Sequence, residues 1–152
     1  MTPGHTYRFR VRARDKAGNV GAWTTASSWS AALTQNSSSS VVYAGAWATA
    51  SSASSSGGSV RSSTAAGATA SLTLSGRAVG LVSTLCAACG AVRVFVDGVL
   101  AATVNTNAAS TTYRQVVFSK GWSSYASHTI RLVVVGTAGT PRVNLDAFEI
   151  IR

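Results

Sequence analysis

Short runs of β-branched and small residues, separated by turn-forming residues, recur from Val41 to the end of this chain, and no window shows a sustained 3.6-residue apolar period. The dipeptide Asp97-Gly98 between two such runs is typical of a two-residue β-hairpin. Many short strands without helices favour two packed sheets, so we expect an all-β fold, an antiparallel β-sandwich of the jelly-roll type. The runs predicted to be strands are Val41–Trp47, Gly58–Ser62, Ala68–Ser75, Ala78–Thr84, Ala91–Val96, Val99–Asn105, Thr112–Ser119, His128–Val135 and Val143–Ile151.

The first thirty residues carry a different pattern. From Tyr7 to Ala13 every second residue is apolar, and arginines alternate with them, which indicates a strand with one half-buried face and one charged face. The segment 15–19 (DKAGN) consists of turn-forming residues, and Val20 begins a return strand. Residues 1–29 are therefore predicted to contain a β-hairpin.

This hairpin resembles the last two strands of a fibronectin type III domain, through the pattern Pro3-Gly4-x-x-Tyr7-x-Phe9-x-Val11-x-Ala13-x-Asp15-x-x-Gly18-Asn19. The resemblance implies that Tyr7 is the family's corner tyrosine, whose hydroxyl bonds to nearby backbone. A complete module of this type has on the order of 100 residues, so we interpret residues 1–29 as a C-terminal fragment and expect the natural protein to continue upstream. Residues 1–5 lack the features of a signal peptide, and we expect any such peptide upstream.

Two further segments complete the predicted organisation. Residues 30–40 (SAALTQNSSSS) have no periodicity and end in four serines, which predicts a flexible linker. Residues 41–152 contain all the remaining strands and are predicted to form the jelly-roll domain.

Residues 41–152 contain three characteristic motifs, Val94-x-Val96-Asp97-Gly98, His128-x-Ile130-Arg131 and Leu145-Asp146-x-Phe148, with Trp47, Gly57-Gly58-Ser59-Val60-Arg61, Gly67, Gly121 and Gly136. Through these residues the second domain resembles the jelly rolls of the galactose-binding-like superfamily. Such domains are often attached to secreted bacterial hydrolases and surface proteins, next to fibronectin type III modules. The resemblance implies a non-catalytic carbohydrate-binding or accessory module of a larger extracellular or cell-surface protein, with a glycan and its own upstream domains as partners. A structural spacer or adhesion module without a sugar site is the alternative.

Few residues could perform acid–base catalysis. The four acids are Asp15, Asp97, Asp146 and Glu149, and the first two lie in predicted turns. Asp146 and Glu149 differ by three positions in one strand, so they point to opposite faces and cannot flank one glycosidic bond. His128 has no nucleophile motif near it. We therefore expect no enzymatic activity.

Asp146, Cys86 and Cys89 are the candidates for structural chemistry. Asp146 shares strand parity with Phe148, so it is predicted to point inward, where backbone amides or an arginine would satisfy it. A structural calcium is the alternative, but the strand from Val41 supplies no second acid; we expect no cofactor. Cys86-Ala-Ala-Cys89 lacks the further ligands of a zinc site, which leaves a short disulfide, favoured in a secreted protein, or two inert thiols.

Aromatic residues are the candidates for glycan binding, because the apolar faces of sugar rings stack on tryptophan and tyrosine. Trp122 and Tyr125 lie between two predicted strands, in a predicted loop where they either bind sugar or cover the end of the sandwich. Trp47 is a further candidate, although its strand position favours the core. Arg61 and Arg131 could donate hydrogen bonds to hydroxyls or to a uronate.

The net charge is +9, from 13 basic and 4 acidic residues, which raises binding of an anionic cell-wall polymer as another alternative. The basic residues are scattered apart from the arginines near the N-terminus, so we expect no specific nucleic-acid binding. No apolar run is long enough to predict insertion into a membrane.

Overall fold

The computed structural model describes residues 2–152, and its regular elements in that range are β-strands apart from one 3-10 turn, η1 (Ser56–Gly58). The all-β prediction is therefore confirmed. The strands are β1 (Thr6–Tyr7), β2 (Arg10–Val11), β3 (Thr24–Thr25), β4 (Trp29–Gln35), β5 (Val41–Ala44), β6 (Ala48–Ser51), β7 (Ser59–Ser63), β8 (Thr69–Leu85), β9 (Ala91–Val96), β10 (Val99–Asn105), β11 (Thr112–Val134), β12 (Val143–Leu145) and β13 (Ala147–Ile151).

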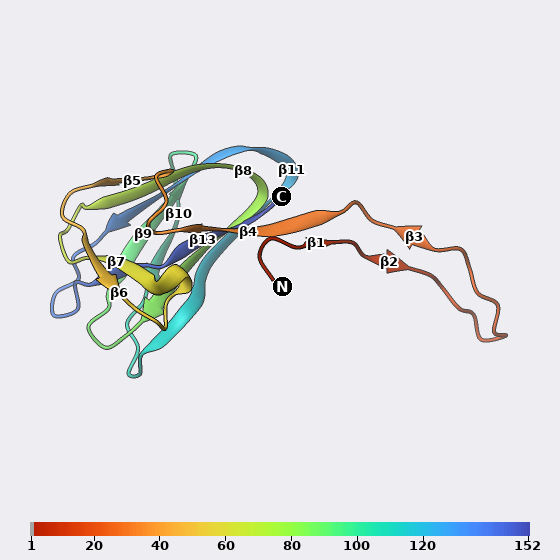
Figure 1. Cartoon of the computed structure of the whole chain (residues 1–152), viewed down its shortest axis with the longest axis horizontal. Helices are drawn as coiled ribbons and strands as arrows, with labels where there is room; N and C mark the ends of the chain where they lie inside the picture. Colours follow the sequence, from red (N-terminus) through yellow and green to blue (C-terminus); the bar gives the residue numbers. More distant parts are fainter. Residues whose placement is uncertain (1) are drawn as a thin grey trace.

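Two long antiparallel strands, β8 and β11, organise the sandwich (Figure 1). The first half of β8 pairs with β5 on one side and with the end of β11 on the other, and β11 continues the layer into β9 and β10. The second half of β8 pairs with β13, which pairs with β4 and so leads to β1. Each long strand thus contributes to both layers. A small sheet of order β12-β7-β6 lies beside them.

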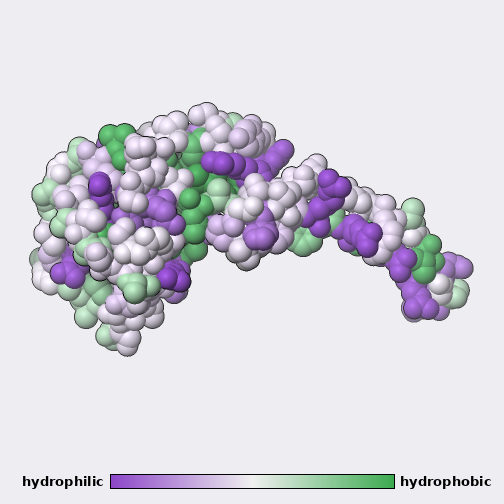
Figure 2. All heavy atoms as spheres, viewed as in Figure 1, coloured by the Kyte–Doolittle hydropathy of each residue, from purple (hydrophilic) through white to green (hydrophobic). Residues whose placement is uncertain are grey.

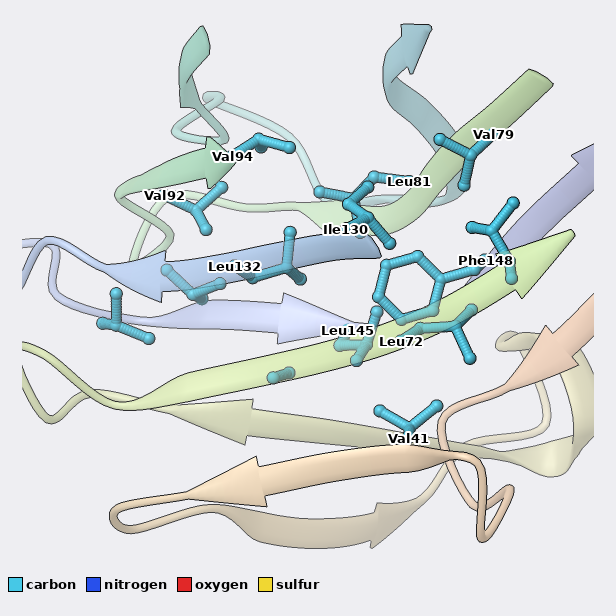
Figure 3. Packing of buried hydrophobic residues seen from close by; sticks show 14 of the residues in the cluster. Val41, Leu72, Val79, Leu81, Val92, Val94, Ile130, Leu132, Leu145 and Phe148 are labelled. Carbon is cyan, nitrogen blue, oxygen red and sulfur yellow. The ribbon is translucent and has the colours of Figure 1, made fainter. Parts of the chain in front are cut away.

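The core lies between the two layers (Figure 3). Leu72 and Ile130 come from the first layer, and Leu81 and Phe148 come from the second; all four are at most 2% exposed. The inward positions alternate along β9 through Val92, Val94 and Val96, as the period-two pattern predicted. The Asp97-Gly98 hairpin is also confirmed, since both residues have positive φ, 51° and 82°, as a type I′ turn requires.

The sequence divided each long strand in two, and the structure joins the halves. Ala68–Ser75 and Ala78–Thr84 are parts of β8, because the chain bends around Gly76 without leaving the ladder. A Cβ at Gly76 would lie 2.7 Å from the carbonyl oxygen of Ile151, so only glycine fits at this bend. Likewise Thr112–Ser119 and His128–Val135 belong to β11.

The prediction of a flexible linker is wrong for residues 30–35. These residues form β4, which pairs along its length with β13. The following residue, Asn36, is fully buried. Its side-chain amide nitrogen donates to the backbone carbonyls of Ser59 and Asp146, at 2.7 and 2.9 Å. The partner strand lies more than 110 residues away along the chain, so no local sequence pattern reveals the pairing.

Residues 5–28 form an arm that extends away from the sandwich (Figure 1). The predicted hairpin is present: β2 pairs with β3, and Arg14 pairs with Val20 across the turn. The Tyr7 hydroxyl bonds to the backbone of Thr2, accepting from its amide at 2.6 Å. No helix within residues 2–152 is both long and apolar enough to cross a membrane.

Candidate functional site

Trp122 and Tyr125 lie within β11 and not in the loop that the sequence predicted. Residues 122–125 bulge out of the ladder, which resumes at Ala126 opposite Gly76. Trp122 stacks on His128 and packs against the core, whereas Tyr125 is 54% exposed. Tyr125 lines a polar cleft of about 290 Å³ together with Thr34, Ser40, Leu72, Thr73, Leu74, Ser75, Ile150 and Arg152. Only one of the two rings is therefore free to meet a ligand.

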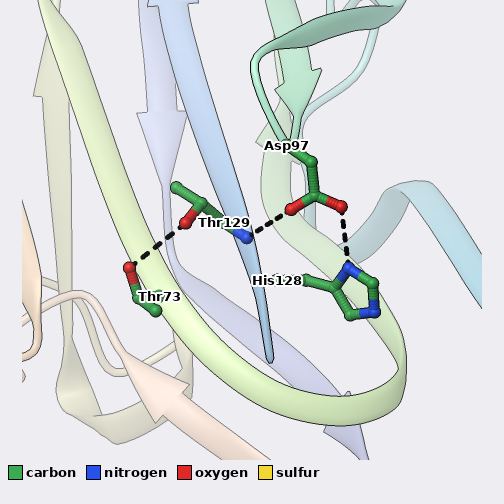
Figure 4. A network of polar contacts seen from close by, with 4 residues as sticks. All are labelled: Thr73, Asp97, His128 and Thr129. Carbon is green, nitrogen blue, oxygen red and sulfur yellow. Dashed lines mark hydrogen bonds and ion pairs between the residues drawn. The ribbon is translucent and has the colours of Figure 1, made fainter. Parts of the chain in front are cut away.

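His128 belongs to a polar network that ties the β9–β10 turn to β11 (Figure 4). Its Nδ1 lies 2.7 Å from Asp97 Oδ2, and the Thr129 amide donates to Asp97 Oδ1 at 2.8 Å. The Thr129 amide and, secondarily, His128 lower the pKa of Asp97. The remaining ring nitrogen, Nε2, is buried without a partner. Nδ1 is engaged by Asp97 and Nε2 is buried, which is consistent with a structural role.

Arg61 and Arg131 are on different elements and do not share a site. Arg61 of β7 lies over the ring of Tyr43 at 4.2 Å, and Arg131 of β11 lies over Phe95 at 4.7 Å. Neither arginine lines the hollows described below. Burial raises the pKa of Tyr43 to about 12, so its hydroxyl remains a donor to the Asn36 carbonyl, at 2.8 Å.

Asp146 is fully buried, as predicted from its parity with Phe148. Both carboxylate oxygens accept from the backbone amide of Ser56, at 2.8 and 3.1 Å. Burial raises the pKa of Asp146, against the opposing effects of the Ser56 amide and the charge of Arg114. Calcium takes six to eight oxygen ligands, whereas this carboxylate faces an N–H donor, and residues 2–152 hold no cluster of three metal-ligating side chains. The Ser56 amide thus satisfies this carboxylate from within the chain, the first of the two arrangements that the sequence left open.

Cys86 and Cys89 form a disulfide in the structure. The bridged loop is fixed on two sides, because the Cys86 amide donates to the Thr106 carbonyl and the Arg142 amide donates to the Ala88 carbonyl, both at 3.2 Å. The disulfide therefore holds the backbone that carries Arg142.

Two adjoining hollows meet at Arg142, and we refer to them together as the Arg142 groove. The first, of about 330 Å³, is lined by Trp47 with Ala46, Ala48, Ser62, Ser63, Thr64 and Arg142. The second, of about 320 Å³, is lined by Tyr113 with Ser51, Ser52, Val60, Thr84, Cys86, Thr111, Arg142 and Asn144. The groove thus has an aromatic ring in each hollow, an arginine where they meet, and hydroxyl groups along its walls.

The local backbone explains how Tyr113 reaches the groove. The β8–β11 ladder shifts between Thr112 and Gln115, so Tyr113 and Arg114 together oppose Thr84. Such a bulge changes the direction of the side chains on the bulged strand, and Arg114 has a positive φ of 55°. Tyr113 is 44% exposed as a result of this placement beside the groove.

Arg114 and Asp146 hold the loop that follows the groove residues Ser51 and Ser52. Arg114 donates to the backbone carbonyls of Ala53 and Ser55 at 3.3 and 3.1 Å. Asp146 accepts the next backbone amide, that of Ser56. The wall of the Tyr113 hollow is therefore anchored to the sandwich at two points, Arg114 of β11 and the junction between β12 and β13.

The polar groups of the groove are available for a ligand. Within residues 2–152 the Arg142 side chain makes no hydrogen bond or ion pair, so its five N–H donors remain free. Asn144 is 7% exposed and uses its amide nitrogen to donate to Cys89 Sγ at 3.1 Å. Its amide oxygen has no protein partner in the same range and can accept from a hydroxyl.

Sequence reasoning identified Trp47 but not Tyr113, Arg142 or Asn144. Asn144 alternates with Val143 and Leu145 in the last predicted strand and gives no signal of its own. Tyr113 stands at the start of a predicted strand, where aromatic residues are common. What brings these residues together is the pairing of β12 with β7 and the bulge in β11, which no local pattern encodes.

Comparison with solved structures shows that the sandwich shares its fold with parts of several proteins. No family model matches the chain, and no curated protein matches it. The CBM36-1 domain, a carbohydrate-binding module from a multidomain xylanase of the hindgut metagenome of Trinervitermes trinervoides, is similar with a TM-score of 0.55 and 16% identity, over 79% of this chain and 95% of that domain. The two chains share a fold.

Larger proteins contain the same fold as one part. A family two carbohydrate esterase from Cellvibrio japonicus is similar with a TM-score of 0.60 and 10% identity, over 81% of this chain and 34% of the esterase. The catalytic domain of a GH87 α-1,3-glucanase in complex with nigerose gives a TM-score of 0.53 and 16% identity, over 79% of this chain and 28% of that domain. At sequence identities of 10% and 16%, the similarity concerns the fold alone.

Proposed function

We propose that the chain is a carbohydrate-binding module and that a polysaccharide lies in the Arg142 groove. The observation that supports this most directly is the combination of Trp47 and Tyr113 with a free arginine where their hollows meet. Tyr113 is 44% exposed and offers an apolar face to a sugar ring, a contact that contributes about 1–2 kcal/mol. Trp47 packs partly against the core and edge-on against Tyr43, and it lines its hollow with the part of the ring that remains exposed. Arg142 and Asn144 are suited to hold sugar hydroxyls between the rings.

The role that we propose is non-catalytic. No Asp, Glu or His lines either hollow among residues 2–152, so the groove has no general acid or base of its own. The module would serve a larger secreted or cell-surface protein by keeping it on its polysaccharide. The CBM36-1 domain supports this proposal as a neighbour that is matched over 95% of its length and is named as a binding module.

The test is affinity gel electrophoresis of the whole chain in gels that contain soluble xylan, together with calorimetric titration of the chain with α-1,3-linked gluco-oligosaccharides. The wild type should bind at least one of them. Tyr113→Ala and Arg142→Ala should each weaken binding about tenfold, the loss that corresponds to roughly 1.4 kcal/mol. Tyr113 is exposed, so its loss should leave the fold intact.

Tyr125→Ala is the matched control, because it removes an equally exposed tyrosine from a different cleft. Normal binding by this variant, with loss in Tyr113→Ala, supports the groove. The reverse result would assign the glycan to the Tyr125 cleft. If the wild type binds neither these probes nor any glycan in a broad array, the carbohydrate function is rejected and a structural spacer is favoured.

A further inference from the structure

The arm carries a row of arginines along one strand. Arg8, Arg10, Arg12 and Arg14 occupy alternate positions of one segment of the arm, in which Arg10 belongs to β2 and Arg14 bridges to Val20. In an extended chain alternate residues lie about 7 Å apart on the same side, and Arg10 and Arg12 do meet at one ring, that of Trp23. Figure 2 shows the hydrophilic residues recurring in purple along the arm. The arrangement is a linear array of cations outside the sandwich.

Trp23 orders the middle of this array. The guanidinium carbons of Arg10 and Arg12 lie 4.4 and 4.6 Å from the centroid of its ring. A guanidinium that stacks through its face keeps its N–H donors in the plane, directed outward. The stacking therefore restricts the rotamers of the two arginines in advance, which reduces the entropy lost on binding.

The charges of the array are not neutralised within the chain. Among residues 2–152, none of the four arginine side chains makes an ion pair. The only carboxylate of the arm, Asp15, bonds to the amide and the side chain of Asn19, both at 2.8 Å. Lys16 adds a fifth positive side chain beside the turn. An excess of unpaired, aligned cations is complementary to a linear polymer with repeated anionic groups.

We propose that this arginine face binds an anionic polysaccharide, through paired N–H donors on the carboxylates of successive uronate residues. Guanidinium and carboxylate match in a planar, two-bond geometry. Single-stranded nucleic acid is the less suitable ligand, because it relies on free aromatic faces for base stacking, and the Trp23 ring is already stacked by two guanidiniums. This surface is separate from the Arg142 groove, and the proposal does not depend on the groove binding sugar.

The experiment measures binding of the whole chain to polygalacturonate, with fully methyl-esterified polygalacturonate as the uncharged control ligand. The wild type should bind only the charged polymer, with an affinity that falls steeply as sodium chloride rises. R10Q/R12Q should weaken binding at least tenfold at low salt and lower the slope of log affinity against log salt by about 1 or more. R8Q/R14Q should weaken binding similarly while leaving both Trp23 contacts in place.

The control variant is R93Q/K120Q, which removes two exposed positive charges from the sandwich. Its affinity should change less than threefold. Equal losses in this variant and in R10Q/R12Q would show that binding follows net charge, and would overturn the proposal. Equal binding of the methyl-esterified polymer, or tighter binding of a single-stranded oligonucleotide at the same salt concentration, would overturn it as well. Neither result depends on the groove, which the Tyr113→Ala variant tests.

Discussion

The indole of Trp122 lies flat on the imidazole of His128, with ring centroids 3.6 Å apart and ring planes within 5° of parallel. His128 is itself held by Asp97, so the stack connects the bulge of β11 to the β9–β10 turn. Trp122 therefore fastens the bend of β11 to the sandwich. Sequence reasoning weighed this role against sugar binding, and the stacked geometry favours the structural role.

Trp122→Ala should lower the free energy of unfolding by about 2 kcal/mol, because it removes a large ring that packs on both His128 and the core. Tyr125→Ala, three residues away and exposed, should change stability by less than about 0.5 kcal/mol. Denaturant titration of the two variants measures both values. A Trp122→Ala variant that is as stable as wild type but no longer binds glycan would show that Trp122 binds the ligand.

The positions of the strands could be predicted from the sequence where apolar and polar residues alternate strictly. The strands Ala91–Val96 and Val99–Asn105 match β9 and β10 residue for residue, because an alternating pattern and an Asp-Gly turn fix both register and boundary. The weakly patterned strands β4 and β6 were missed. β6 consists of small, exposed residues, and β4 has no apolar alternation although it contains Trp29 and Leu33. The place of β4 in the sheet depends on β13, which is distant in sequence.

The candidate site was harder to predict from the sequence than the fold. Trp47 was recognisable as an aromatic residue, and Asp146 as a buried acid, from their positions in strands. The groove itself arises where the small β12-β7-β6 sheet meets the ends of β8 and β11. A sequence without long-range pairing information cannot place Arg142 between Trp47 and Tyr113.

The pH dependence of stability should report the buried carboxyl of Asp146. Since burial raises its pKa in the folded state, the folded protein holds this proton more tightly than the unfolded chain. The favourable contribution of the protonated group is complete below about pH 3.9, the ordinary pKa of aspartate, and is lost as pH rises through the folded-state pKa. Asp146→Asn stays neutral, so its stability relative to wild type should increase between pH 3 and pH 7 in thermal melts.

Two results would contradict this account. A relative stability that is constant with pH would mean that the pKa of Asp146 is not raised. A wild type that gains stability at pH 7 on addition of calcium chloride, with no gain in Asp146→Asn, would mean that the carboxylate binds the ion.

The Cys86–Cys89 disulfide should contribute roughly 2 kcal/mol of stability, the chain-entropy value for so short a loop. A reducing agent should lower the melting temperature of the wild type and have no effect on C86S/C89S. Because the bridged loop holds the Arg142 backbone, C86S/C89S should also bind glycan more weakly than wild type. Mass spectrometry of the native protein should find the two cysteines two hydrogens short of the free thiols; two thiols that alkylate without reduction would refute the bridge.

Truncation should locate the true boundary of the sandwich. Sequence reasoning placed it at Val41, but β4 pairs with β13, and Asn36 bonds to the carbonyl of Asp146 from inside the core. Deletion of residues 1–28 removes the arm, the two-residue pairing of β1 with β4 and the bond from the Gly4 amide to the Ala31 carbonyl. These contacts lie at the edge of the sheet, so the melt of residues 29–152 should stay close to that of the full chain.

Deletion of residues 1–40 should have a much larger effect. It strips β4 from β13, so backbone groups that were paired become exposed, and it leaves the Tyr43 hydroxyl and the Ser59 carbonyl without the bonds that residue 36 supplies. Each buried polar group left unpaired costs about 1–3 kcal/mol, which is a large share of the stability of a small domain. Residues 41–152 should therefore melt far below residues 29–152 or fail to fold. Equal melting temperatures for the two truncations would instead restore the boundary at Val41 and make β4 a dispensable edge.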